Sequence, residues 1–132
     1  MSNMSVCIIY IFKKIYTTIL KNEGITLKDF IFNEISELLK ELNIRNKKYS
    51  IINDYHFGGY GKVNGELIDF INWFKENFGI SLDPIYTGKA FFAVWDMIKT
   101  DKFEKNLKIV LLHTGGLQGI EGFNRKNENI IQ

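Results

Sequence analysis

Three glycine-containing loops hold most of the side chains in this sequence that could do chemistry. They lie at positions 54–61, 82–89 and 112–119, and each combines glycine with tyrosine, threonine, histidine or lysine. Glycine lets backbone amides approach a ligand closely, and a phenol of lowered pKa can act as a general acid or base. A hydroxyl can donate or accept a hydrogen bond. The three loops are therefore candidates for ligand binding, with a plain tight turn as the alternative for Thr114-Gly-Gly116.

Two of these loops can be compared with known kinds of site. The loop 112–119 follows an apolar strand, and open α/β sheets bind ligands beyond the carboxyl ends of their strands. Tyr86 to Lys89 opens a helix, whose first amides could hold an anion, but it lacks the spacing of a nucleotide P-loop. His56 and His113 lie far apart with no cysteine cluster, so we expect no metal site. For both histidines a structural role is favoured over a catalytic one.

The elements that must position these loops alternate between strands and helices. Hydrophobic spacing and end signals predict strands over 6–12, 47–53 and 108–112 and helices over 26–42, 64–78 and 90–100. The last strand, a continuous apolar run, is typical of a parallel strand buried on both faces. The last helix is apolar almost all round, which is typical of a helix enclosed in a larger body.

This order predicts an α/β fold, a partial parallel sheet with flanking helices. Three strands would leave faces and edges uncovered. We therefore expect residues 1–132 to form a single partial domain, with a polar tail that frays over 125–132.

Composition excludes several classes of protein. The 132 residues are 45% hydrophobic, which is enough for a core, and their net charge of +2 leaves no basic footprint for nucleic acid. A single cysteine, Cys7, excludes a disulfide framework. The apolar run Val6 to Phe12 is too short to span a membrane and lacks a signal peptide's basic start. The cytoplasm is the expected compartment.

Taken together, the loop sequences resemble one enzyme family. Asp54-Tyr-His-Phe-Gly-Gly-Tyr60, Leu82-Asp-Pro-Ile-Tyr-Thr-Gly-Lys89 and Leu112-His-Thr-Gly-Gly-Leu-Gln-Gly119 are similar in order and spacing to the 1-aminocyclopropane-1-carboxylate deaminase and D-cysteine desulfhydrase family. The resemblance extends from about position 53 to 124. It implies pyridoxal 5'-phosphate as cofactor and the type II fold of the tryptophan synthase β-subunit, of which this chain would be the C-terminal part.

The resemblance also assigns roles to single residues. Tyr60 and Tyr86 match the family's active-site tyrosines, which implies catalytic roles. Thr87 matches the residue that faces the pyridine nitrogen, and threonine there favours the desulfhydrase-like branch. Thr114 and Gly115 match a loop that closes over the cofactor. The lysine that forms the Schiff base belongs to the family's N-terminal half and is not identified in this chain, because Lys89 matches a different family lysine.

The function implied is that of a deaminase or desulfhydrase fragment. The whole enzyme would release ammonia and a 2-oxo acid from a small amino acid, and we expect this chain to be inactive alone. The alternative is a non-catalytic remnant, or the half of a split enzyme that docks onto a separate N-terminal half. A family-like homodimer is compatible with either interpretation. The sequence leaves the substrate open, and also whether this chain alone is an enzyme.

Overall fold

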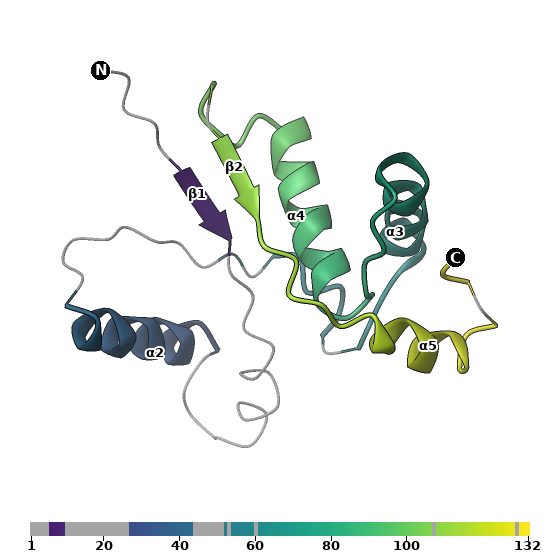
Figure 1. Ribbon diagram of the computed structural model, residues 1–132, viewed down its shortest axis with the longest axis horizontal. Coiled ribbons are helices and arrows are strands. Elements are labelled where there is room, and N and C mark those ends of the chain that lie inside the picture. The colour runs from purple at the N-terminus through teal and green to yellow at the C-terminus, as the bar shows by residue number, and fades with distance from the viewer. Residues whose placement is uncertain are drawn as a thin grey trace. The chain divides into compact units, whose positions relative to one another are not determined.

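The computed structural model describes residues 6–9, 27–43, 52, 54–59, 61–106, 108–128 and 130–132. The chain divides into two compact units, one of residues 12–54 and the other of residues 1–11 together with 55–132. In Figure 1 the first unit contains helix α2, and the second contains β1, α3, α4, β2 and α5.

The smaller unit is described mainly by α2, Leu27–Glu41. This helix was predicted from an apolar stripe, and it ends where Asn43 takes a left-handed conformation with φ 51°. Leu38 and Leu42 from that stripe are 44% and 58% exposed. The expected cap, Thr26, lies outside the described residues. The stripe forms a helix, as predicted, but its last turn is not buried by the described residues.

Two strands of the larger unit pair in parallel: β1, Val6–Ile9, and β2, Lys108–Leu111. They run side by side in the same direction in Figure 1, with Ile8 opposite Val110. The third strand predicted over 47–53 lies outside the described residues except at Ile52.

Within this chain β2 is buried on one face only, and not on both as its apolar pattern predicts. Ile109 and Leu111 are half-buried, and Leu111 packs against the hydrophobic core. Val110 and, just after the strand, Leu112 are 51% and 49% exposed. Successive side chains of a strand point to opposite faces, so the described residues cover one face and leave the other open.

Helix α3, Gly65–Phe78, has the ends that its sequence predicts. The Asn64 side chain accepts a hydrogen bond from the Leu67 amide at 3.0 Å, which satisfies one of the free N–H groups of the first turn. Gly79 ends the helix in the left-handed region, with φ 69°, and its amide bonds to the Lys75 carbonyl.

Helix α4, Thr87–Lys99, lies beside α3 (Figure 1) and begins three residues before the predicted start at about Ala90. Phe91 and Val94 are buried, whereas Ile98 is 46% exposed, so one face of the helix is enclosed and not its whole circumference. Two tryptophans, Trp73 and Trp95, are half-buried at the margin of the core, with ring centroids 4.8 Å apart.

The C-terminal segment differs from the expected frayed tail. A short helix, α5, spans Gln118–Asn124, which the sequence had not indicated. Beyond it Ile131 is only 3% exposed and belongs to the core. Its amide and carbonyl both bond to the side chain of Asn124, and Asn72 bonds to the carbonyl of Ile130. The burial of Ile131 and the hydrogen bonds from the side chains of Asn72 and Asn124 attach the end of the chain to α3 and α5. Among the described residues no helix has the length and apolar character to cross a membrane.

Candidate functional site

The start of α4 is organised by the carboxylate of Asp83, which is 1% exposed. One carboxylate oxygen accepts from the amides of Ile85 and Tyr86, at 3.0 and 2.8 Å. The other accepts from the Thr87 amide at 2.9 Å, and the Asp83 carbonyl accepts from the Gly88 amide at 2.8 Å. A carboxylate is favourable at the positive end of a helix. This capping explains why α4 begins earlier than its apolar pattern indicates.

The Thr87 hydroxyl is part of the same network and is buried, at 2% exposure. It donates its hydrogen to the Asp83 carboxylate at 2.6 Å and accepts from the Asp83 amide at 2.9 Å. Two residues four positions apart therefore fix each other's side chain. The amides of Ile85, Tyr86 and Thr87 at the entry to α4 are bonded to this carboxylate, so these three are not free to hold an external anion.

Close packing holds the loop against α3. A Cβ atom added at Gly88 would lie 2.7 Å from the Asp83 carbonyl oxygen and 2.7 Å from Cδ1 of Ile71. Both distances are far below van der Waals contact. Only glycine fits here, because the backbone of α4 touches the loop and the neighbouring helix at this point.

Lys89 connects the start of α4 to the loop at 54–61. Its Nζ donates to the carbonyls of His56 and Gly59, each at 2.9 Å, and lies 5.8 Å from the centre of the Phe57 ring. Burial lowers the pKa of the Lys89 ammonium, and the negative charge of Asp83 acts in the opposite direction.

The same loop also packs on α4 further along the helix. The Tyr55 hydroxyl donates to the Asp96 carboxylate at 2.7 Å. The Phe57 ring meets the Phe92 ring edge to face, with centroids 5.2 Å apart. Phe57 has a φ of 55° and Gly58 one of 92°, so the chain turns sharply before position 60.

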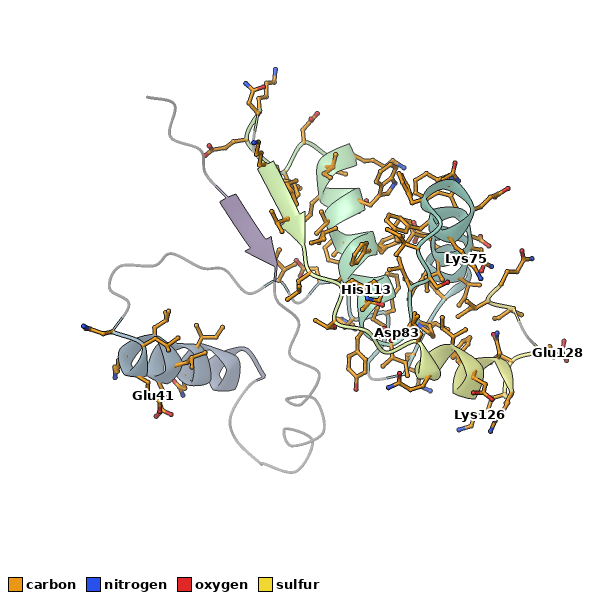
Figure 2. The ribbon with its side chains drawn as sticks, viewed as in Figure 1. Glu41, Lys75, Asp83, His113, Lys126 and Glu128 are labelled. Atoms are coloured by element: carbon orange, nitrogen blue, oxygen red, sulfur yellow. The ribbon has the colours of Figure 1, made fainter. Side chains whose placement is uncertain are left out.

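His113 connects the third loop to the second. The Gly115 amide donates to Nδ1 of His113 at 3.1 Å, so Nε2 carries the hydrogen and donates to the Ser81 carbonyl at 2.9 Å. The ring also meets Phe91 edge to face. Figure 2 shows His113 and Asp83 on neighbouring segments near the start of α4. Both ring nitrogens bind backbone, in keeping with the structural role favoured for this histidine.

The structure places the predicted site residues unequally. Tyr86 and Thr87 belong to the Asp83 network. Gly115 bonds to His113, whose other ring nitrogen bonds to the Ser81 carbonyl, two residues before Asp83. Thr114 is exposed. Tyr60 lies outside the described residues, but Gly59 and Gly61 on either side of it are described.

Sequence reasoning missed the residues that join the loops: Asp83, Lys89 and His113 in its bridging role. Asp83 stands four residues before Thr87 and directly before Pro84, a spacing suited to a helix cap. That signal was available in the sequence. The partners of Lys89 and His113 lie about thirty residues away and give no local pattern. Within the described part of the chain, no group of three or more histidine, cysteine or acidic side chains is placed to bind a metal.

Comparison of the fold defines the class of protein first. The chain superposes on a crystal structure described as an "ACC deaminase homologue" with a TM-score of 0.69 and 33% sequence identity. The match covers 81% of this chain and 32% of that chain. The fold is therefore that of a 1-aminocyclopropane-1-carboxylate (ACC) deaminase homologue, over part of its length.

Comparison of the sequence gives the particular relatives. Curated proteins named "Putative 1-aminocyclopropane-1-carboxylate deaminase" are 40% identical in Pyrococcus furiosus and 41% identical in Pyrococcus horikoshii, over 92 residues each. These matches cover 66% and 69% of this chain but only 27% and 26% of the relatives. No family model matches the chain. The resemblance to ACC deaminases that the three loops predict is confirmed. The chain spans about a quarter of the length of the curated relatives.

Proposed function

We propose that this chain supplies the C-terminal part of a pyridoxal-phosphate-dependent deaminase or desulfhydrase that acts on a small amino acid. The observation that carries the proposal is the junction of the three loops. Lys89 joins the first loop to the start of α4, and His113 joins the third loop to the second. The relatives named as ACC deaminases supply the reaction class, and the family resemblance of the loops implies pyridoxal phosphate as the cofactor.

The polar groups at the start of α4 fit the ring of the cofactor and not its phosphate. The amides of Ile85, Tyr86 and Thr87 are bonded to the Asp83 carboxylate, so they are not free to hold a phosphate. The Thr87 hydroxyl has donated its hydrogen to Asp83 and accepted one, which leaves a lone pair. Toward a ring nitrogen, Thr87 would therefore act as an acceptor, which requires that nitrogen to carry a proton.

The other predicted residues have roles that follow from their chemistry. When bound, pyridoxal phosphate supplies an electron sink for a small amino-acid substrate. The phenols of Tyr60 and Tyr86 would hold or move a proton, and the glycine loop at Thr114 and Gly115 would close the site. Gly115 has a φ of 80° with open space where its Cβ would stand, which suits a backbone that approaches a ligand.

The exposed face of β2 supports the need for a larger fold. Val110 and Leu112 are apolar and half-exposed, and 68% of the solved homologue (100 − 32) has no counterpart in this match. We propose that β1 and β2 belong to a larger parallel sheet whose remaining strands and helices cover this face. The same missing part would supply the lysine and the phosphate loop. It would come from a longer form of this chain or from a separate N-terminal half, and the complete assembly would form a family-like homodimer.

The test is complementation. The purified chain is mixed with a second chain that carries the remaining three quarters of a Pyrococcus relative, and pyridoxal phosphate is added. After borohydride reduction, we expect no covalently attached cofactor on either part alone. Together they should label one lysine of the second chain and release ammonia and a 2-oxo acid from small amino acids. Labelling of a specific lysine in this chain alone, with turnover, would contradict the proposal.

Thr87 provides a sharper test in the complemented complex. Thr87→Val keeps the shape of the side chain but removes the hydroxyl, so turnover should fall about tenfold while cofactor absorbance is retained. Thr87→Ser keeps the hydroxyl and is the matched control. Because the hydroxyl also bonds to Asp83, thermal unfolding of both variants is measured first. Loss of bound cofactor, in place of lost rate, would argue against this role.

A further inference from the structure

The loop that leads to Tyr60 consists of two successive turns. The Gly59 amide bonds to the His56 carbonyl at 3.1 Å, and the Lys62 amide bonds to the Gly59 carbonyl at 3.2 Å. In the sequence Tyr60 directly follows Gly59, whose carbonyl accepts the second of these bonds. Each of these bonds alone is weak, because backbone turns of this size compete with water.

Lys89 binds the carbonyls that close both turns. Its ammonium donates to the same His56 and Gly59 oxygens, at 2.9 Å each, from the first turn of α4. A hydrogen bond from a charged donor is stronger than a neutral one. Each carbonyl oxygen has two lone pairs, so it can accept both its turn amide and the ammonium.

The surroundings of Lys89 argue against a solvated surface charge. The residue is half-buried, and its ammonium lies over the Phe57 ring, which is itself packed on Phe92. Among the described residues, no carboxylate lies within salt-bridge distance of the Lys89 ammonium. The ion pair in this part of the chain joins two other residues, Arg125 and Glu121, within α5 and its C-terminal end. The carboxylate of Asp83 is nearby but is bonded to helix amides. Backbone carbonyls are thus the partners of this charge.

We propose that Lys89 is a positioning residue of the candidate site, whose ammonium fixes the His56 and Gly59 carbonyls, just before Tyr60 in the sequence, against the start of α4. It would act through the backbone and would not touch the reacting atoms. That Lys89 positions Tyr60 for the reaction is the part of the proposal that rests on the proposed function. The contact between Lys89 and the turns does not, and can be tested without cofactor or turnover.

The first experiment uses the unmodified chain. In a sample labelled with ¹³C and ¹⁵N, the Cε resonance of Lys89 and the carbonyl resonances of His56 and Gly59 are followed as the pH is raised from neutral. We expect all three to move with one midpoint, below the ordinary value for lysine because burial lowers the pKa of Lys89. A Lys89→Arg variant stays charged, so its carbonyl resonances should not move. If the carbonyl resonances of His56 and Gly59 do not shift as Lys89 titrates, the proposal is overturned.

The second experiment measures how strongly Lys89 protects the loop from proteolysis. Lys89→Met keeps an unbranched stem but removes the donors, and chymotrypsin cleavage after Phe57 or Tyr60 should become about tenfold faster. Lys99→Met, at the exposed end of the same helix, is the matched control and should leave the rate unchanged. Cleavage after Trp95 reports global unfolding. Equal rates at the loop in Lys89→Met and the control would overturn the proposal. If the loop result holds but complementation fails, the positioning role stands and the proposed function falls.

Discussion

The loop before α4 and the exposed face of β2, which carries Val110, lie in one compact unit. They differ in whether the described residues provide their hydrogen-bond partners and their apolar contacts. Around Asp83 every described buried side-chain nitrogen or oxygen has a partner, and the loop closes on itself within five residues. On β2, apolar Val110 is 51% exposed. The loop is complete with the residues present, whereas the strand has an apolar face with no described cover.

The difference separates local from non-local stabilisation. A carboxylate that caps a helix four residues away needs little else to form. A buried parallel strand needs neighbours on both faces, which come from distant parts of a chain. The described residues therefore supply the hydrogen-bond partners of the site loop, whereas under the proposed function the sheet would depend on further parts of the fold.

The largest expected effect comes from removing the Asp83 carboxylate. Asp83→Ala leaves three amides and a hydroxyl without their buried acceptor, so unfolding free energy should fall by about 3 kcal/mol. Urea denaturation measures the change. Asp69→Ala, at an exposed position of α3, is the control and should stay within about 0.5 kcal/mol of the parent. An Asp83→Ala loss as small as that of the control would erase the contrast between the two regions.

Gly88 should come next. Gly88→Ala places a methyl group 2.7 Å from both the Asp83 carbonyl oxygen and Ile71, and relieving that overlap should cost about 2 kcal/mol. Gly122→Ala makes the same change in α5, where the added methyl meets nothing within 4 Å. There it should stabilise the helix slightly, by up to about 1 kcal/mol. Thermal unfolding of the two variants should therefore shift in opposite directions; a shift in the same direction would show that the close approach at Gly88 is not tight.

The smallest effect on stability should come from the exposed strand. Val110→Lys changes a side chain already half in solvent, so unfolding free energy should move by less than about 0.5 kcal/mol. The same variant should lose complementation, because a charge would be buried against the missing part. Val110→Ile is the matched control and should complement normally. Full complementation by Val110→Lys would mean that this face stays exposed in the assembled protein.

Local signals in the sequence were reliable where the physics is local. Asn64 and Gly79 bound α3 as predicted, because a cap depends on residues three or four positions away. The start of α4 was placed three residues late because the apolar pattern was followed and the Asp83 cap was overlooked. The tail was misjudged for a different reason: its anchors, Asn72 and Asn124, act on Ile130 and Ile131 through contacts that a polar composition hides.

By itself, the sequence determined the three loops, the helices between them and the family they resemble, since these depend on residue type and spacing. It also indicated that Tyr86 and Thr87 stand together. Only the tertiary structure decided what joins the loops: Lys89 to the turns before Tyr60, and His113 to the Ser81 carbonyl. Those hydrogen bonds connect residues about thirty positions apart. Their partners are backbone carbonyls, which every residue has, so no sequence pattern could single them out.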